Sequence, residues 1–495
     1  MHSVNKLSRG EIYSIFYYTG YICILLGLIM LIPIIIALIY NEHQLIIPFV
    51  YSTIISLLIG VPLYQYYKNK TELSLKSAMI FAAGIWLIGC ALAALPYYLS
   101  GQLPYWDSYF EAMSGFTTTG FTMYPNLDEV PYAMQFWRGF TQWLGGIGII
   151  VLVLTILTSP SINIMRMYAA EGRDERITPS IRHTTRIILY IYSLYTAISV
   201  VLFILAGMPL FDSVFYTFSA LSTGGFALGN ESIFFYHNAW IEFVAIVVMI
   251  IGGTNFALHY TILKGNWKEY FKDIETKVAY PLLIIGTLIV AGFLYNTSYY
   301  GHDMLLSLRY SVFQVVSALT TTGLQTAMPA EITQKWTGLG IFVLTILMII
   351  GAGACSTGGG IKWLRIGILV KGAWWQVKQL LVPSKAIISH KIHHVRDLWV
   401  TDDILRLTGL FVFVYLLVYL ISVIIVLIYY QNVAQVLFEV ASALSNVGLA
   451  DGLVTYSSPV VVKIVFIIDF WVGRLEIWPV LLLFTIIINN DPRKR

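Results

Sequence analysis

Charged residues are scarce in this chain. Only 11% of its 495 residues are Asp, Glu, Lys or Arg, whereas 58% are hydrophobic. A soluble domain of this composition would expose far too much apolar surface to water. The composition therefore excludes an ordinary soluble protein and predicts a protein that crosses a lipid bilayer several times.

Cysteine is also rare, and the sequence patterns of common enzymes are missing. Cys23, Cys90 and Cys355 lie far apart in expected membrane segments, which excludes a disulfide framework and a cysteine-based metal site. The sequence contains no His-Glu-x-x-His pattern, no nucleophile with a neighbouring base and no catalytic pair of carboxylates. It thus gives no support for enzymatic activity.

Long apolar segments make up most of the chain. Each is near or above the ~20 residues that a membrane-spanning helix needs. The first begins soon after Lys6 and Arg9 and shows no cleavage pattern, so we expect it to be retained as an anchor. The segments cover residues 12–40, 46–66, 77–99, 135–158, 186–207, 240–263, 278–298, 338–370, 404–430 and 460–488. Two segments come first, and four pairs follow.

Basic residues fall at alternate ends of these segments. All but five of the 30 lie at ends that the positive-inside tendency assigns to the cytoplasm. Both chain termini are then cytoplasmic, and the net charge of +4 reflects topology rather than a nucleic-acid partner. The cytoplasmic groups are Lys6 and Arg9, Lys68 to Lys76, Arg166 to Arg186, Lys264 to Lys277, Lys362 to Arg406 and Arg493 to Arg495. The exceptions are Arg138, Arg309, Lys335, Lys463 and Arg474.

A polar turn that ends in glycine occurs once in each of the four pairs. The turns are Ser114–Gly120, Ser219–Gly225, Ser317–Gly323 and Ser442–Gly448. About ten residues before each turn can form a short helix, which we expect at Asp107–Phe116, Asp212–Leu221, Leu306–Leu319 and Val433–Leu444. The expected N-caps of the first two are Asp107 or Ser108 and Asp212 or Ser213.

Such a short helix would enter from the outside and end near the middle of the membrane. Its carbonyl end, which carries a partial negative charge, would attract cations. The turn that follows would present carbonyl oxygens in place of an ion's hydration shell, which membrane depth tolerates only where the backbone lines a cavity. Small residues that merely allow close helix packing are the alternative, but four copies in register favour a cation pore.

Three further stretches complete a pattern that resembles a known family. Trp143–Gly148 opens the helix after the first turn, Gly351–Lys362 is rich in glycine, and Gly473–Glu476 lies in the last apolar segment. Together with the turns they resemble the Trk/Ktr/HKT superfamily of potassium transporters. The two extra N-terminal segments resemble its TrkH-like branch, and the resemblance extends from about residue 12 to residue 490.

The resemblance implies a potassium selectivity filter made by the four turns. In the plant branch a serine in the first turn accompanies sodium permeation, whereas this chain has Gly120, so potassium is expected. The fourth turn has the fewest threonines, which makes the four ligand sets unequal. The implied potassium-binding residues are Thr117, Thr118, Thr119 and Gly120; Ser222, Thr223, Gly224 and Gly225; Thr320, Thr321, Thr322 and Gly323; and Ser445, Asn446, Val447 and Gly448.

The glycine-rich stretch should interrupt the second helix of the third pair, because each glycine disfavours a helix by about 1 kcal/mol. It lacks the third glycine of a dinucleotide fingerprint and follows no strand, so we expect no organic cofactor. The resemblance places it under the filter as a gate. The implied gate residues are Gly351, Gly353, Ser356, Thr357, Gly358, Gly359, Gly360 and Arg474.

Arg474 lies in an expected membrane segment, where a charge is costly unless it faces the pore or a partner. Facing the pore, it would be an electrostatic barrier below the filter, as the resemblance implies. A buried ion pair with Glu476 or Asp469 is the structural alternative. His390, His393 and His394 lie in a basic cytoplasmic connection, where a solvated segment or a partner-docking surface is expected.

The sequence therefore predicts an all-α polytopic membrane protein with four helix-pore loop-helix repeats in pseudo-fourfold arrangement plus two N-terminal helices. The expected units are 1–75, 76–160, 161–265, 266–372 and 373–495. The expected function is potassium uptake through a gated pore in the cell membrane. The alternatives are a symporter coupled to sodium or protons, and a non-conducting sensor. The resemblance also implies a homodimer and a cytosolic, nucleotide-binding, TrkA-like regulatory subunit.

Overall fold

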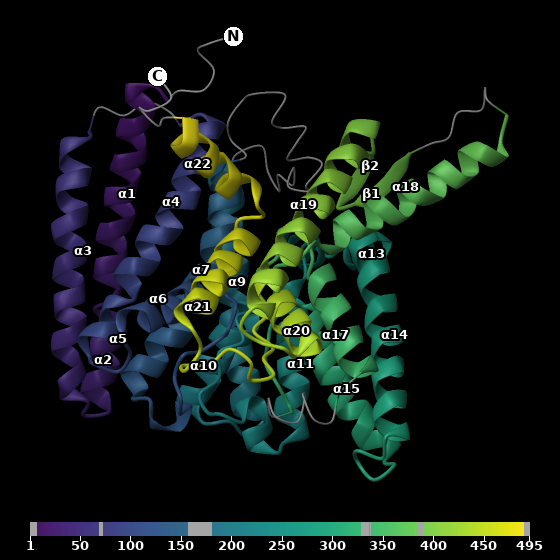
Figure 1. Ribbon diagram of the computed structural model, residues 1–495, viewed down its shortest axis with the longest axis horizontal. Coiled ribbons are helices and arrows are strands. Elements are labelled where there is room, and N and C mark those ends of the chain that lie inside the picture. The colour runs from purple at the N-terminus through teal and green to yellow at the C-terminus, as the bar shows by residue number, and fades with distance from the viewer. Residues whose placement is uncertain are drawn as a thin grey trace.

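The computed structural model describes residues 7–68, 73–156, 181–327, 336, 338–383 and 390–489 (Figure 1). Within these ranges the chain is helical apart from its connections and one two-stranded hairpin, so the predicted all-α class is confirmed. Six of the described helical runs are long and apolar enough to cross a membrane, and one bent pair of helices adds a seventh candidate. The boundary expected at residues 160 and 161, together with Lys6, Lys70, Arg166, Lys335 and Arg493 to Arg495, lies outside the described residues.

The N-terminal element is a helical hairpin. Its helices α1 and α3 pack along each other, and α2 joins them at the far end (Figure 1). Small residues allow the close approach, since a side chain on Gly20 or Gly60 would overlap the backbone of the other helix. The bounds are α1 (Arg9–Ile29), α2 (Ile32–Ile39) and α3 (Ile46–Tyr66).

Each of the four following units has a long helix, a short helix and a second long element. Unit one contains α4 (Leu75–Ala93), α5 (Leu95–Leu99), α6 (Tyr105–Phe116) and α7 (Tyr132–Ile156); unit two contains α9 (Ile181–Leu205), α10 (Leu210–Leu221), α11 (Ala239–Gly253), α12 (Phe256–Leu263) and α13 (Trp267–Lys272). Unit three contains α14 (Ile274–Asn296), α15 (Met304–Leu319), α17 (Leu339–Ile350) and α18 (Trp363–Leu381). Unit four contains α19 (Asp402–Leu427), α20 (Val433–Leu444), α21 (Val460–Arg474) and α22 (Trp478–Asn489), and the strands β1 (Lys391–His394) and β2 (Arg396–Trp399) precede it.

The short helices α6, α10, α15 and α20 lie close to the predicted ranges. They have 12, 12, 16 and 12 residues, too few to span a bilayer. The expected caps are wrong for the first two, because α6 and α10 begin directly after Pro104 and Pro209. A proline has the fixed φ that suits entry into a helix, and it places Asp107 and Asp212 in the first turn instead.

Three second helices are broken. The glycine-rich stretch separates α17 from α18, as predicted. Residues 240–263, expected as one helix, form α11 and α12, which meet at 105°. Residues 460–488, also expected as one helix, form α21 and α22, and the left-handed residues Glu476 and Ile477 separate them.

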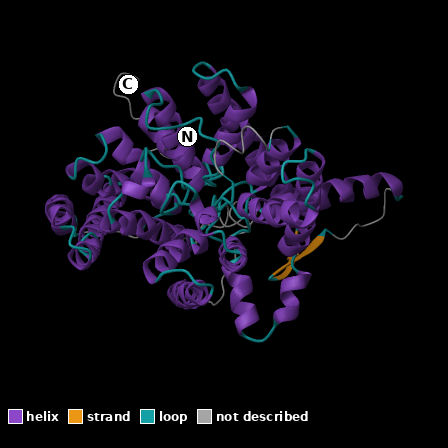
Figure 2. Ribbon diagram, turned by 90° about the horizontal axis from the view of Figure 1, so that it is seen from below, coloured by secondary structure: helices purple, strands orange, loops and turns teal. Residues whose placement is uncertain are grey.

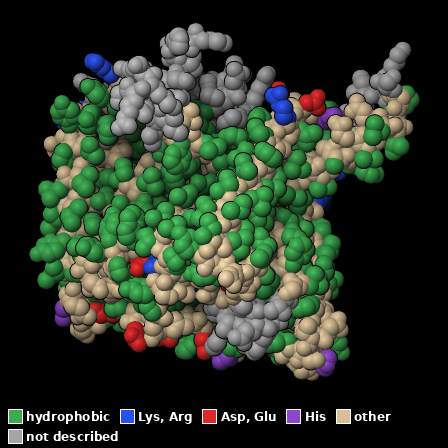
Figure 3. All heavy atoms as spheres, viewed as in Figure 1, with side chains coloured by type: hydrophobic (Ala, Val, Ile, Leu, Met, Phe, Trp, Pro, Cys, Tyr) green, Lys and Arg blue, Asp and Glu red, His purple; other side chains and the backbone are tan. Residues whose placement is uncertain are grey.

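Two ion pairs join neighbouring units. Lys463 of α21 contacts Asp107 of α6 at 2.5 Å, and this pair ties the fourth unit to the first. Arg309 of α15 contacts Glu242 of α11 at 2.7 Å and ties the third unit to the second. Figure 3 shows hydrophobic side chains across most of one face of the molecule, as expected for a surface that contacts lipid.

Candidate functional site

The four glycine-ended turns have the same backbone conformation. The residues two before each final glycine all adopt left-handed φ values, which are 52° for Thr118, 52° for Thr223, 55° for Thr321 and 54° for Asn446. The final glycines follow with φ of 97°, 79°, 85° and 90° for Gly120, Gly225, Gly323 and Gly448. Non-glycine residues rarely adopt this conformation, and it recurs in all four turns. The four units therefore share one turn geometry.

Each turn is held to its short helix by the serine that begins it. The backbone carbonyls of Ser114, Ser219, Ser317 and Ser442 accept hydrogen bonds of 2.7–2.9 Å from the N–H groups of Thr119, Gly224, Thr322 and Val447. The serine hydroxyls complete the attachment. Those of Ser114 and Ser442 accept from the N–H groups of Gly120 and Gly448, whereas those of Ser219 and Ser317 donate to the carbonyls of Phe226 and Leu324.

The four turns form a closed ring. A side-chain carbon on Gly120 would overlap the carbonyl of Gly224 in the second turn, and one on Gly225 would overlap that of Thr322 in the third. In the same way Gly323 faces the carbonyl of Val447, and Gly448 faces the carbonyl of Thr119. Each turn therefore touches the next in cyclic order, and Figure 2 shows loops gathered at the centre of the surrounding helices.

Backbone carbonyls and threonine hydroxyls dominate this ring. All eleven non-glycine residues among the filter residues named above are buried among the helices. Oxygen atoms in such a setting can replace the hydration shell of a monovalent cation. The hydroxyls of Thr117 and Thr119 lie 2.7 Å apart, and those of Thr320 and Thr322 lie 2.8 Å apart.

The fourth turn differs from the others, as its sequence predicts. Asn446 donates from its amide nitrogen to the hydroxyl of Thr119 at 3.0 Å and to the carbonyl of Phe470 at 2.9 Å. The Ser445 hydroxyl is hydrogen-bonded to Tyr415 at 2.7 Å. The side chains of this turn thus bond to neighbouring protein groups, and its backbone carbonyls remain as the group shared with the other turns.

Residues 351–362, called the intramembrane loop below, lie directly against the turns. The Thr357 hydroxyl contacts that of Thr223 at 3.1 Å, and the N–H of Gly359 donates to the Thr321 hydroxyl at 2.8 Å. A side chain on Gly359 would overlap the carbonyl of Ser445 in the fourth turn. The loop therefore contacts three of the four turns, and its glycines permit this approach.

Arg474 holds the loop from the fourth unit. Its guanidinium donates to the carbonyl of Thr357 and, at 2.9 Å, to the carbonyl of Gly145 in α7. The carboxylates expected as partners bond elsewhere, because Glu476 contacts Arg365 at 2.5 Å and Asp469 accepts from Ser422 at 2.7 Å. Arg474 thus makes its hydrogen bonds to backbone carbonyls, one on the loop and one on the first unit, and its side chain is buried.

Sequence reasoning missed several residues that support the ring. Gln142 donates to the carbonyl of Gly224 at 2.6 Å, and Lys362 donates to the carbonyl of Gly358 in the loop. Glu275 accepts from the N–H of Ala354 at 2.5 Å. Among the supporting residues, the four serines that begin the turns are the ones that a repeated sequence pattern marks, since each stands six residues before the final glycine of its turn.

Two carboxylates next to the turns have a structural role. Glu111 accepts from the N–H of Met123 at 2.8 Å and pairs with Arg138 at 2.8 Å. Glu439 accepts from three backbone N–H groups of residues 451–454. Both side chains are fully buried, so they hold the segments that leave the filter.

Comparison with known proteins identifies the family. The family model described as "Cation transport protein" (TrkH) matches residues 46–494. An uncharacterized cation transporter of Methanocaldococcus jannaschii is 34% identical over 487 residues, which are 97% of this chain and 96% of that protein. The Trk system potassium uptake protein TrkH of Escherichia coli is 32% identical over 482 residues, 94% of this chain and 97% of that protein.

A solved structure agrees with these sequence matches. The crystal structure of the potassium transporter TrkH from Vibrio parahaemolyticus superposes with a TM-score of 0.84 at 28% identity, and the match covers 97% of this chain and 99% of that chain. The two relatives and this solved structure each match at least 94% of the chain. The chain therefore belongs to the TrkH family of cation transport proteins.

Proposed function

We propose that this chain takes up potassium ions across the cell membrane through the ring of four turns. The observation that carries the proposal is the cyclic contact of Gly120, Gly225, Gly323 and Gly448 with the carbonyls of the neighbouring turns. Four carbonyl-bearing turns around one axis are the arrangement that can compensate the dehydration of a monovalent cation. The family relatives named for potassium uptake support potassium as that ion.

The proposed ion ligands are the sixteen residues of the four turns, 117–120, 222–225, 320–323 and 445–448. Their backbone carbonyls provide most of the sites, because the side chains of Asn446 and Ser445 bond to protein groups. Potassium is transported and bound here, and no organic cofactor is part of the proposal. Selectivity for potassium is weaker than in a symmetric filter, since the fourth turn has no threonine and its one hydroxyl, on Ser445, bonds to Tyr415.

The proposed gate is the intramembrane loop with Arg474. The loop contacts three turns, and Arg474 joins it to α7. A guanidinium carries a positive charge, so it repels a potassium ion that approaches along the same path. Opening then requires that two sets of hydrogen bonds break: the bond from Arg474 to the loop, and the bonds between the loop and the turns.

The proposed orientation places both termini and the hairpin β1–β2 in the cytoplasm. Most basic residues lie near the two termini and in the connections on the same side of the membrane, which supports this orientation. A homodimer and a cytosolic, nucleotide-binding regulatory subunit are proposed by family resemblance. The inside-negative potential supplies about 2.3 kcal/mol per charge per 100 mV, so inward flux needs no chemical step.

Single-channel recording of the purified protein in planar bilayers tests the proposal. With potassium on one side and choline on the other, discrete currents that reverse at the potassium equilibrium potential are expected. A symporter, the second candidate, instead requires a sodium or proton gradient for rubidium uptake into vesicles and gives no discrete currents. Uptake that stops when the second gradient is collapsed, with potassium still present, would replace the pore by the symporter.

A further inference from the structure

The hairpin β1–β2 packs against the beginning of α14. Its strands pair in antiparallel register, with Lys391 opposite Trp399 and His394 opposite Arg396. Its outer face is exposed, and Trp399 is 64% exposed there. By contrast, Ile392 and His394 are buried on the side that faces α14. The hairpin thus has one face toward the surroundings and one face toward the transport unit.

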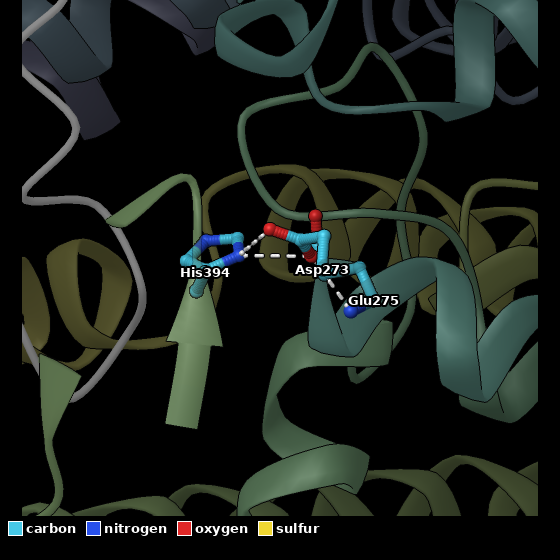
Figure 4. A group of neighbouring side chains, drawn as sticks. All are labelled: Asp273, Glu275 and His394. Atoms are coloured by element: carbon cyan, nitrogen blue, oxygen red, sulfur yellow. Dashed lines mark hydrogen bonds and ion pairs between the residues drawn. The ribbon is translucent and has the colours of Figure 1, made fainter. Parts of the chain in front are cut away.

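Asp273, the N-cap of α14, receives the tip of the hairpin. Its two carboxylate oxygens lie 3.1 and 3.2 Å from Nδ1 of His394 (Figure 4). One of them also accepts the N–H of Val395 at 2.7 Å. The expectation of a solvated segment is therefore wrong for His394, because a carboxylate at the start of α14 draws it into the protein.

The same carboxylate is hydrogen-bonded toward the intramembrane loop. Asp273 accepts the N–H of Glu275 at 2.8 Å, and Glu275 Oε1 accepts the N–H of Ala354 at 2.5 Å. Oε2 of Glu275 accepts from the amide of Asn255 at 3.3 Å, at the corner between α11 and α12. A continuous set of hydrogen bonds therefore runs from the hairpin tip to the loop.

An apolar cluster follows the same route. Ile274 stands between Asp273 and Glu275 and packs with Ala354 of the loop. The cluster is separate from the main core, and it joins the hairpin, the start of α14, α18 and the loop. Its buried members are Ile274, Ala354, Leu364, Ile368, Trp375, Ile392 and Val400. Displacing the hairpin would therefore expose apolar surface as well as break hydrogen bonds.

His394, Asp273 and Glu275 also have the chemistry of a divalent metal site, with donor atoms within 4.8 Å of one another. All four carboxylate oxygens, however, already accept a hydrogen bond. The donors are the N–H groups of Glu275, Val395 and Ala354 and the Asn255 amide. A set of acceptors satisfied in this way is a structural network that fixes its members in place.

We propose that the hairpin β1–β2 sets the position of the intramembrane loop, with Asp273 and Glu275 as positioning residues between them. A cytosolic partner that moves the exposed face of the hairpin would release Ala354 and so loosen the loop under the filter. The inference rests on the gating role proposed above for the loop. It adds the route by which a movement of the hairpin on the cytoplasmic side would change the position of that gate.

Hydrogen exchange measured by mass spectrometry on the full-length protein in nanodiscs tests the coupling. The variants are Asp273→Asn and His394→Gln, and the matched control is Asp403→Asn, whose exposed side chain pairs with the exposed Arg406. Exchange in peptides covering residues 352–360 should become about tenfold faster in both variants and stay unchanged in the control. If Asp273→Asn does not fold, His394→Gln alone carries the test, since its side chain belongs to the hairpin.

Unchanged exchange in the loop, with faster exchange in the hairpin, would overturn the coupling. One equivalent of divalent metal in the purified protein, lost in His394→Gln, would also overturn the hydrogen-bonded network. Rubidium uptake by the same variants separates the two proposals. Faster loop exchange with unchanged uptake keeps the coupling and removes the gating role of the loop, whereas faster exchange with altered uptake supports both.

Discussion

The guanidinium of Arg474 donates a hydrogen bond to the backbone carbonyl of Thr357, 117 positions earlier in the chain. The same Thr357 contacts the hydroxyl of Thr223 in the second turn. Arg474 is therefore connected to the ring of turns through one intermediate residue, Thr357, although it lies at the end of α21 in the fourth unit. A single side chain thus connects the inner end of the last unit to the centre of the ring.

Arg474→Ala should raise rubidium uptake, because it removes the charge proposed to repel the ion and a hydrogen bond that holds the loop. The lost hydrogen bonds should also lower stability by roughly 1–3 kcal/mol. Uptake into vesicles and the apparent melting temperature are measured on the same preparation. Arg406→Ala, which removes a 77% exposed arginine side chain, is the control and should change neither. A folded Arg474→Ala protein with unchanged or reduced uptake would contradict the barrier role.

Gly120→Ser should raise sodium permeability relative to potassium. A side chain at this position overlaps the carbonyl of Gly224 and is strained at a φ of 97°, so at least one carbonyl of the ring must move. Reversal potentials under sodium and potassium gradients measure the permeability ratio. Gly101→Ser is the matched control, because Gly101 has a φ of 73° but open space around it. An unchanged ratio in well-folded Gly120→Ser would remove this residue from the filter.

The composition and the repeated turns were sufficient to predict the class and the short helices. α20 has the predicted bounds, and α15 begins two residues earlier than expected. The glycines of residues 351–360 also predicted the break after α17. These features depend on local preference and on periodicity along the chain, which a single sequence records.

Contacts between distant segments could not be predicted in the same way. The bond between Glu275 and Ala354 joins residues 79 positions apart, and nothing in the spacing indicates it. Likewise, Glu476 forms its ion pair with Arg365, although Arg474 lies only two residues before Glu476 in the sequence. The break before α22 was not predicted either, because Glu476 and Ile477 adopt left-handed conformations that side chains of their kind disfavour.

Ser442→Ala should weaken potassium selectivity while leaving the protein folded. The Ser442 hydroxyl accepts the N–H of Gly448 at 3.0 Å, and its loss leaves a buried donor unsatisfied at a cost of about 1–3 kcal/mol. Bi-ionic reversal potentials measure the effect on selectivity. Ser457→Ala, an exposed serine in the loop after this turn, is the control. If both variants keep the wild-type permeability ratio, the serine hydroxyl does not shape the turn.

Asp107→Asn should destabilise the protein more than the double variant Asp107→Asn/Lys463→Met. The pair joins the first and fourth units at 2.5 Å, and its side chains are only 7% and 6% exposed. Removing one partner leaves a buried ammonium without its carboxylate, which costs roughly 3–5 kcal/mol in fully buried pairs, whereas removing both charges avoids that cost. The apparent melting temperature of each protein in one detergent measures the order. Asp403→Asn, from an exposed pair, should shift it little. Equal losses in the single and double variants would show that the charge pair does not hold the ring closed.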